Sequence, residues 1–307
     1  MSPSTNGRIV VALTIDWEGA YLSPDGLDAL DEFRRALGPV PLTHFVSAAY
    51  FTKDRPDPTA VATITQAVHK GDELALHLHA WRSLAKASGI QPKLSPSFLT
   101  GTDKLLEFED GDVGFDTDLD AYGVPELRVL LRTSQHLLEQ IHVPISKTFR
   151  AGGYLGTPKV LQALREEGFT VDSSATDFRQ LDERKDEFLP KRLQAIWPGV
   201  DTTTQPWLVR APGGSLLEMP IAAFADYATT DEIVAVFEAA HARLLKSPGR
   251  DVFVVVGFHQ ETAQDFGSRL GEALKKVRGR RELADGLMFT TIEDAAERAR
   301  RVASSGP

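Results

Sequence analysis

The sequence predicts an α/β fold in which parallel strands alternate with helices and close, or nearly close, into a barrel. Short apolar runs alternate with longer amphipathic stretches in roughly seven strand–helix units, and such repetition implies parallel strands joined by right-handed crossovers. The hydrophobic content of 42% and the charged content of 25% are ordinary for a soluble protein with a sizeable core. An open doubly wound sheet is the alternative, but no Gly-x-Gly-x-x-Gly or P-loop pattern follows the first strand. We expect a single domain across residues 1–307.

The alternation is most regular in the first quarter of the chain. The apolar run RIVVALTID (8–16) predicts a buried strand, and an amphipathic pattern predicts a helix at 25–38. PLTHFVSAAYF (41–51) predicts the second strand, and a second helix is expected at 57–71. DELALHLH (72–79) is the third strand. Both helices end at a glycine, which readily adopts the left-handed conformation that terminates a helix.

The same alternation resumes after a break. A long helix with a proline in its first turn is expected at 124–141, followed by a strand at 147–151. The pattern then predicts a helix at 157–168 and two further strands, at 169–174 and 215–221.

The last quarter contains the most apolar strand of the chain, DVFVVVGFH (251–259). The helix before it, at 229–247, begins with threonine and aspartate residues that can cap its first turn. A strand at 287–292 and a helix at 293–303 complete the prediction.

Residues 82–121 interrupt this rhythm with a long insertion rich in Asp, Glu and Gly. Loops of this length within a compact domain are usually functional or disordered. The insertion is therefore expected to be either a lid or substrate-binding element, or a solvated acidic excursion.

Composition excludes several classes of function. The net charge of −9 argues against binding a nucleic-acid backbone, which needs a basic face. The chain has no cysteine, so disulfides, thiolate metal sites and a cysteine nucleophile are excluded. There is neither a signal-peptide pattern at the start nor an apolar run of membrane-spanning length, so we expect a cytoplasmic protein with no membrane partner. Oligomeric state is left open.

Polar residues gather at the predicted ends of several strands. In parallel barrels the carboxyl ends of the strands meet at one rim, where the chemistry takes place. A single Asp or His at a strand end is commonly a cap. Here, however, five strand ends each supply a polar group that would be unfavourable in an apolar core. These residues are Asp16, Glu18, His77, His79, Arg150, Tyr154, Asp172 and His259.

The spacing of these residues suits a metal site. Residues two apart on a strand point the same way, so His77 and His79 can converge, as can Asp16 and Glu18. Two imidazoles and a carboxylate with an open position form a familiar catalytic zinc arrangement. A second carboxylate could take a proton from water, a histidine could protonate a leaving group, and an arginine could orient the base. This chemistry suits hydrolysis of an amide or an ester.

Several other residues have two readings. Trp17 and Trp81 flank the candidate ligands and are either walls of a substrate pocket or core aromatics. His44 is interpreted as a packed, hydrogen-bonded histidine.

The chain resembles the polysaccharide deacetylases of the carbohydrate esterase family 4 superfamily. The motif-like stretches are LTIDWEG, GDELALHLHAW, TFRAGGY, VDSSATD, LLEMPI and VVVGFHQE, and the resemblance spans about residues 8–300. It implies a distorted (β/α)7 barrel that hydrolyses N-acetyl or related amides with a divalent metal, most commonly zinc. By the same resemblance, Asp16 is the general base, Arg150 orients it, His259 is the general acid and the Tyr154 backbone N–H stabilises an oxyanion. Trp17, Trp81 and Asp172 are expected at the substrate.

One motif departs from the family pattern. Glu18 takes the place of a metal-binding aspartate and His77 matches the first histidine ligand, but the family's second histidine comes four residues later, where Trp81 stands. His79 then has to be the second ligand, in an HLHxW form that resembles cytoplasmic branches of the superfamily.

The expected function is removal of an acetyl or similar acyl group from an N-acylated sugar or small molecule. Two alternatives stay open: a metal-independent amide hydrolase resembling allantoinase, and a non-catalytic member that binds a carbohydrate or small molecule.

Overall fold

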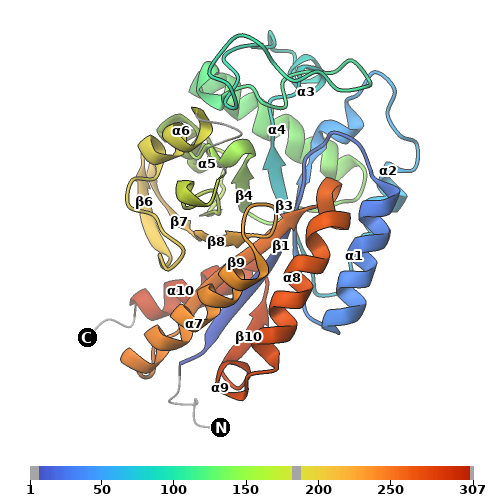
Figure 1. Ribbon diagram of the computed structural model, residues 1–307. Helices are drawn as coiled ribbons and strands as arrows, with labels where there is room; N and C mark the ends of the chain where they lie inside the picture. The colour runs from blue at the N-terminus through green and yellow to red at the C-terminus, as the bar shows by residue number, and fades with distance from the viewer. Residues whose placement is uncertain (1–6, 182–187, 305–307) are drawn as a thin grey trace.

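The structure, a computed structural model, describes residues 7–181 and 188–304. Its parallel strands form a curled, distorted (β/α)7 barrel with helices packed outside the sheet (Figure 1), which confirms the predicted fold class. Neighbouring strands follow the order β5–β4–β3–β2–β1–β9–β8. Their bounds are β1 Ile9–Trp17, β2 Thr43–Ser47, β3 Glu73–Leu78, β4 Thr148–Ala151, β5 Val171–Asp172, β8 Ile221–Phe224 and β9 Val252–His259.

A bent segment connects the two ends of this strand order. β7 (Gly214–Glu218) pairs in parallel with β5, and the chain then continues past Pro220 into β8, which pairs with β9. A further parallel bridge joins Thr176 to β8. Proline cannot donate to a strand ladder, so the strand predicted at 215–221 is broken into two. The antiparallel neighbour of β7, β6 (Trp207–Ala211), is not indicated by the sequence pattern.

β1 is the central strand, with three neighbours. It pairs with β9 along most of its length and with β2 from Thr14 to Trp17. Its first residues, Ile9 to Ala12, pair instead with β10 (Leu287–Thr290), which fills the space that the shorter β2 leaves free. Every residue of β1 is buried, as expected for a parallel strand covered on both faces.

The larger helices surround the sheet (Figure 1). They are α1 Pro24–Leu37, α2 Ala60–Ala67, α4 Val124–Gln140, α5 Pro158–Glu166, α7 Thr230–Lys246, α8 Ala263–Arg278 and α10 Ile292–Ser304. The shorter ones are α3 Arg82–Ala87, α6 Phe188–Ile196 and α9 Arg281–Ala284. Each described helix is too short or too polar to cross a membrane.

Local sequence explains where two of these helices begin. The Ser23 hydroxyl accepts the Gly26 N–H at the start of α1, and Pro24 occupies its first turn. α7 begins with a capping box, in which Thr229 and Glu232 satisfy each other's backbone N–H groups. These signals explain why both helices start within a residue of the predicted positions.

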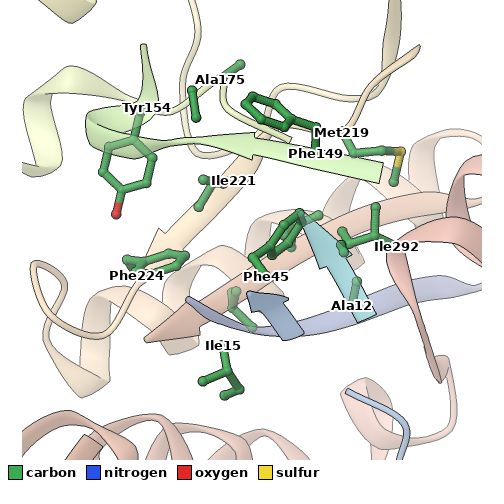
Figure 2. Packing of buried hydrophobic residues seen from close by; sticks show 14 of the residues in the cluster. Ala12, Ile15, Phe45, Phe149, Tyr154, Ala175, Met219, Ile221, Phe224 and Ile292 are labelled. Carbon is green, nitrogen blue, oxygen red and sulfur yellow. The ribbon is translucent and has the colours of Figure 1, made fainter. Parts of the chain in front are cut away.

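Alternation along the strands divides the core into two layers. Phe45 and Phe224 face inward among the buried hydrophobic side chains (Figure 2). The rings of both residues cover the Arg150 guanidinium, at 4.1 and 5.3 Å. His44 faces outward, where the Arg34 guanidinium contacts its Nε2 and Trp17 donates to its Nδ1. This confirms the interpretation of His44 as a packed, hydrogen-bonded residue.

Buried acidic residues anchor part of the insertion 82–121. Asp112 pairs with Lys53 at 3.0 Å, and Asp116 accepts the Ser97 hydroxyl at 2.5 Å. Both carboxylates are buried. Other acidic residues of the insertion, Asp103, Glu107 and Glu109, are exposed to solvent.

Candidate active site

The carboxyl ends of β1, β3, β4 and β9 bring the predicted polar residues together. Glu18 follows β1, and its Oε2 lies 3.5 Å from His77 Nε2 and in very close contact with His79 Nε2. The other carboxylate oxygen of Glu18 lies 3.2 Å from Nε2 of His259, at the end of β9. Burial raises the pKa of Glu18, but the two histidines of β3 outweigh it and hold that pKa well below its usual range.

Backbone carbonyls fix the orientation of both β3 histidines. His77 Nδ1 lies 3.0 Å from the Arg150 carbonyl oxygen, and His79 Nδ1 lies 2.6 Å from that of Phe115. A carbonyl can only accept, so Nδ1 carries a proton in each ring, and Nε2 is the nitrogen that faces the site. This is the arrangement that metal-binding histidines show, with the second ring nitrogen held by an acceptor.

Four buried polar atoms at this place have no hydrogen-bond partner: Asp16 Oδ2, Glu18 Oε2, His77 Nε2 and His79 Nε2. Buried polar groups are nearly always satisfied, so such a cluster needs an explanation. Potential ligand atoms of Glu18, His77 and His79 lie within 4.8 Å of one another, as do those of Asp16, Glu18 and His259. The first set, two imidazoles and one carboxylate, matches the donors of a catalytic zinc site.

Arg150 holds Asp16 in place. Its Nη1 donates to Asp16 Oδ1 at 2.7 Å and to the Thr14 hydroxyl at 2.9 Å, and its remaining donors bond the carbonyl and hydroxyl of Ser173. Both members of the pair are fully buried. One carboxylate oxygen of Asp16 is thus fixed, and the other faces the site.

His259 has a partner that the sequence motifs do not reveal. Its Nδ1 lies 2.9 Å from Oδ1 of Asp226, a residue in the turn after β8. Burial lowers the pKa of His259, but Asp226, Glu18 and Asp16 more than offset this and raise it to about 10. The imidazole is therefore protonated at neutral pH.

The sequence motifs also do not indicate a second carboxyl group of the site, that of Glu261. Glu261 accepts the Glu18 N–H at 3.1 Å and the Tyr50 hydroxyl at 2.6 Å. Burial and the charge of Glu18 raise the pKa of Glu261 to about 8. It lies two residues beyond His259, in the stretch GFHQE, and this closeness in sequence to His259 could have indicated that Glu261 belongs to the site.

The turn after β4 is shaped by two unusual backbone conformations. Gly153 and Tyr154 have φ angles of 58° and 62°, a region that a residue with a side chain rarely adopts. A Cβ on Gly152 would lie 2.5 Å from the His79 ring, and one on Gly153 would lie 2.8 Å from Phe98. The two glycines therefore make room for these rings.

Three predicted substrate-binding residues lie elsewhere. Trp17 is fully buried on the outer face of β1, because alternation places it opposite Asp16 and Glu18. Trp81 is also fully buried, and its indole N–H donates to the Glu18 carbonyl oxygen at 2.9 Å. It therefore holds the backbone of Glu18 in place. Asp172 is buried beneath the site and accepts the Ser174 hydroxyl.

Two adjoining cavities lie at the site. An inner one of about 120 Å³ is lined by Asp16, His77, His79 and Tyr154 among others. An outer one of about 630 Å³ shares Glu18 and His259 with it. The outer cavity therefore lies directly beside the candidate ligands.

No family model and no curated protein matches the chain. Solved structures do match. A candidate polysaccharide deacetylase from Mycobacterium smegmatis has a TM-score of 0.54 and 16% identity, covering 99% of this chain and 94% of that one. Puue allantoinase and a candidate polysaccharide deacetylase from Pseudomonas aeruginosa PAO1 each have a TM-score of 0.50 and 14% identity, covering 96% of this chain and 91% and 92% of theirs. The chain thus has the fold of these proteins.

Proposed function

We propose that this protein is a metal-dependent hydrolase that removes an acetyl or similar acyl group from an amide nitrogen. The observation that carries the proposal is the cluster of four buried, unpartnered atoms on Asp16, Glu18, His77 and His79. A divalent cation held by the last three would satisfy their lone pairs, and two imidazoles with one carboxylate suit zinc. The bound ion would supply polarisation of the amide carbonyl and a lowered pKa for water.

Asp16 is proposed to be the general base. Arg150 fixes one of its oxygens, which leaves Oδ2 free to take a proton from water as that water adds to the carbonyl carbon. The inner cavity places this oxygen beside the two histidines of β3.

His259 is proposed to be the general acid, and Asp226 its positioning residue. As the C–N bond breaks, the nitrogen takes a proton from His259 Nε2, which faces the site while Nδ1 is held by Asp226. The oxyanion is proposed to accept the N–H of Tyr154, whose backbone lies at the wall of the inner cavity. The amine and the carboxylic acid then leave.

The resemblance of the sequence motifs to the polysaccharide deacetylase superfamily supports the same reaction class, and so does the shared fold. The likeness to Puue allantoinase keeps a metal-independent amide hydrolase as the alternative. The buried atoms of Asp16, Glu18, His77 and His79 that make no hydrogen bond favour the metal-dependent hydrolase, because a bound cation would satisfy them.

Chelation tests the proposal. Release of free amine from a panel of N-acetyl and N-formyl amides would be measured before chelation, after it, and after zinc is returned. We expect activity to be lost and then restored. Activity that survives complete removal of metal would support the allantoinase-like alternative. A metal-loaded protein that binds amides and hydrolyses none of them would be a binding protein.

A further inference from the structure

The outer cavity that leads to the site has an apolar lining. Away from its inner end, its wall consists mostly of carbon surfaces, contributed by Ala20, Tyr21, Leu99, Phe108, Phe115, Leu181, Leu189, Pro190, Tyr227 and Phe266. Its volume of about 630 Å³ lies in the range of sites that enclose small molecules. A cavity of this size suits a small ligand.

The charged groups of the lining lie together at the reacting end. Asp226 pairs with His259, and Glu18 contacts the β3 histidines. One carboxylate oxygen of Glu261 accepts the Glu18 N–H and the Tyr50 hydroxyl, and the other is buried without a hydrogen-bond partner. These groups gather at the catalytic centre, so they do not extend along the cavity as a row of partners for a polar substrate.

The insertion supplies much of the apolar wall. Leu99, Phe108 and Phe115 all come from residues 82–121 and line the outer cavity. The rings of Phe108 and Phe115 lie 5.6 Å apart in an edge-to-face arrangement. The acidic residues of the insertion point elsewhere, as the pairing of Asp112 with Lys53 shows. An acidic sequence therefore presents an aromatic face to the substrate.

A sugar would fit this wall poorly. Each sugar hydroxyl that loses water needs a hydrogen-bond partner, even where the ring stacks on an aromatic face. Among the described lining residues away from the reacting end, hydroxyls come from Tyr21 and Tyr227, whose side chains are both exposed, and from Thr262. The Thr262 hydroxyl already donates to Asp226 at 2.5 Å.

We infer that the substrate is a small amide carrying an apolar group of aromatic size, which occupies the outer cavity while the amide lies at Glu18 and His259. The inference rests on the proposed function for the hydrolytic step alone; binding of the apolar group does not depend on it. The insertion acts as the specificity element, because its rings form the wall that this group contacts.

The test compares matched acetamides. Release of amine from N-benzylacetamide would be measured against N-acetylglucosamine and diacetylchitobiose, and phenylacetamide would show whether the ring is accepted on the acyl side. Binding would be measured separately by calorimetric titration with 4-phenyl-2-butanone, a ketone that replaces the amide nitrogen by carbon and cannot be hydrolysed.

The variants are Leu99→Asn and its control Leu106→Asn. Both leucines belong to the insertion, but Leu106 is exposed and does not line the cavity. We expect the wild type to have a kcat/KM at least about tenfold higher for an aromatic amide than for either sugar. This ratio of kcat/KM values should fall by about tenfold in Leu99→Asn and stay unchanged in Leu106→Asn. Leu99→Phe keeps the wall apolar but narrows the cavity, so this variant should also bind the ketone more weakly than the wild type does. Melting temperatures would verify that each variant folds.

Four results are decisive. Better turnover of the sugars, or equal effects of Leu99→Asn and Leu106→Asn, would overturn the inference and leave the hydrolase intact. Absence of ketone binding would also overturn it. Ketone binding that depends on Leu99, without hydrolysis of any amide, would sustain the inference and refute the proposed function.

Discussion

Asp16 is a buried carboxylate with one oxygen held by Arg150 and the other facing the site. Asp16→Asn keeps the shape but removes the base, so we expect kcat to fall by roughly 10²- to 10⁴-fold. Arg150 keeps its bonds to Thr14 and Ser173, so the chain should fold, with stability lowered by about 3 kcal/mol. Turnover, a thermal melt and metal content would be measured together. Unchanged turnover would rule Asp16 out as the base.

Asp226 controls the acid that serves the leaving amine. A general acid works while it is protonated, so activity should decline as the pH rises through the pKa of His259, which is raised to about 10. Asp226→Asn removes the partner that raises this pKa most, and the alkaline limb of the pH–rate profile should move to lower pH. Asp231→Asn, at an exposed carboxylate on α7, is the control and should leave the limb in place. An unmoved limb in Asp226→Asn would exclude this role.

At the residue level, the sequence predicted that Glu18, His77 and His79 come together, because strand ends converge in any parallel barrel. The same alternation that pairs Asp16 with Glu18 puts Trp17 on the other face, so that error was avoidable. Trp81 lies beyond the end of β3, where no strand period applies. Asp226 stands in a turn with no motif of its own, and its role follows only from the three-dimensional contact.

At the scale of elements, two buried carboxyl groups join β5 to β7. Burial raises the pKa of Asp172 to about 6, and burial together with Asp172 raises that of Glu218 well above its usual range. The folded state therefore holds protons that the unfolded chain releases above about pH 4.5. This contribution to stability is complete below that pH and is lost as the pH rises through the folded-state pKa values.

Glu218→Gln tests this pair. A glutamine can still accept the Ala175 N–H and can donate to Asp172 without titrating. We expect the variant to lose about 2 kcal/mol less stability than the wild type between pH 5 and pH 8. Urea unfolding at both pH values would measure the difference. An identical pH dependence in the two proteins would show that the pair does not share a proton.

The insertion is held down by Asp112. Its carboxylate accepts the Ser83 N–H at the start of α3 and pairs with Lys53, whose ammonium lies 3.3 Å from the Trp81 ring centre. Asp112→Ala should destabilise the protein by about 2 kcal/mol because it leaves a buried ammonium unpaired. Hydrogen exchange should quicken in the insertion. Asp110→Ala, at a more exposed carboxylate 3.8 Å from Lys53, should cost less than about 1 kcal/mol. Equal effects would contradict this anchoring role.

Element prediction failed where local signals were weak. α8 contains Gly267 and Gly271, which lower helix propensity, although a Cβ at either position would make ordinary contacts, with Phe258 at 3.7 Å and Phe33 at 3.8 Å. The helix is stabilised by packing against α1 rather than by its own sequence. β5 contains only Val171 and Asp172 and is much shorter than the run predicted at 169–174.

At the scale of the whole molecule, the repeated strand–helix pattern was enough to predict a barrel. The manner of closure was not, since it depends on one bent segment that pairs with β5 before Pro220 and with β9 after it. The walls of the substrate cavity were also beyond the sequence, because they combine the insertion with α6, α8 and the turn after β8. Contacts between segments so far apart in the chain produce no periodic pattern in the sequence.

The central claim is that Glu18, His77 and His79 hold a divalent metal ion. Elemental mass spectrometry of the purified wild type, His79→Ala and the exposed control His69→Ala tests it most directly. The account predicts near-stoichiometric zinc or another divalent ion in the wild type and in His69→Ala, and its loss from His79→Ala. A wild type without metal, even after incubation with zinc, cobalt or nickel, would contradict it and indicate a metal-free amide hydrolase.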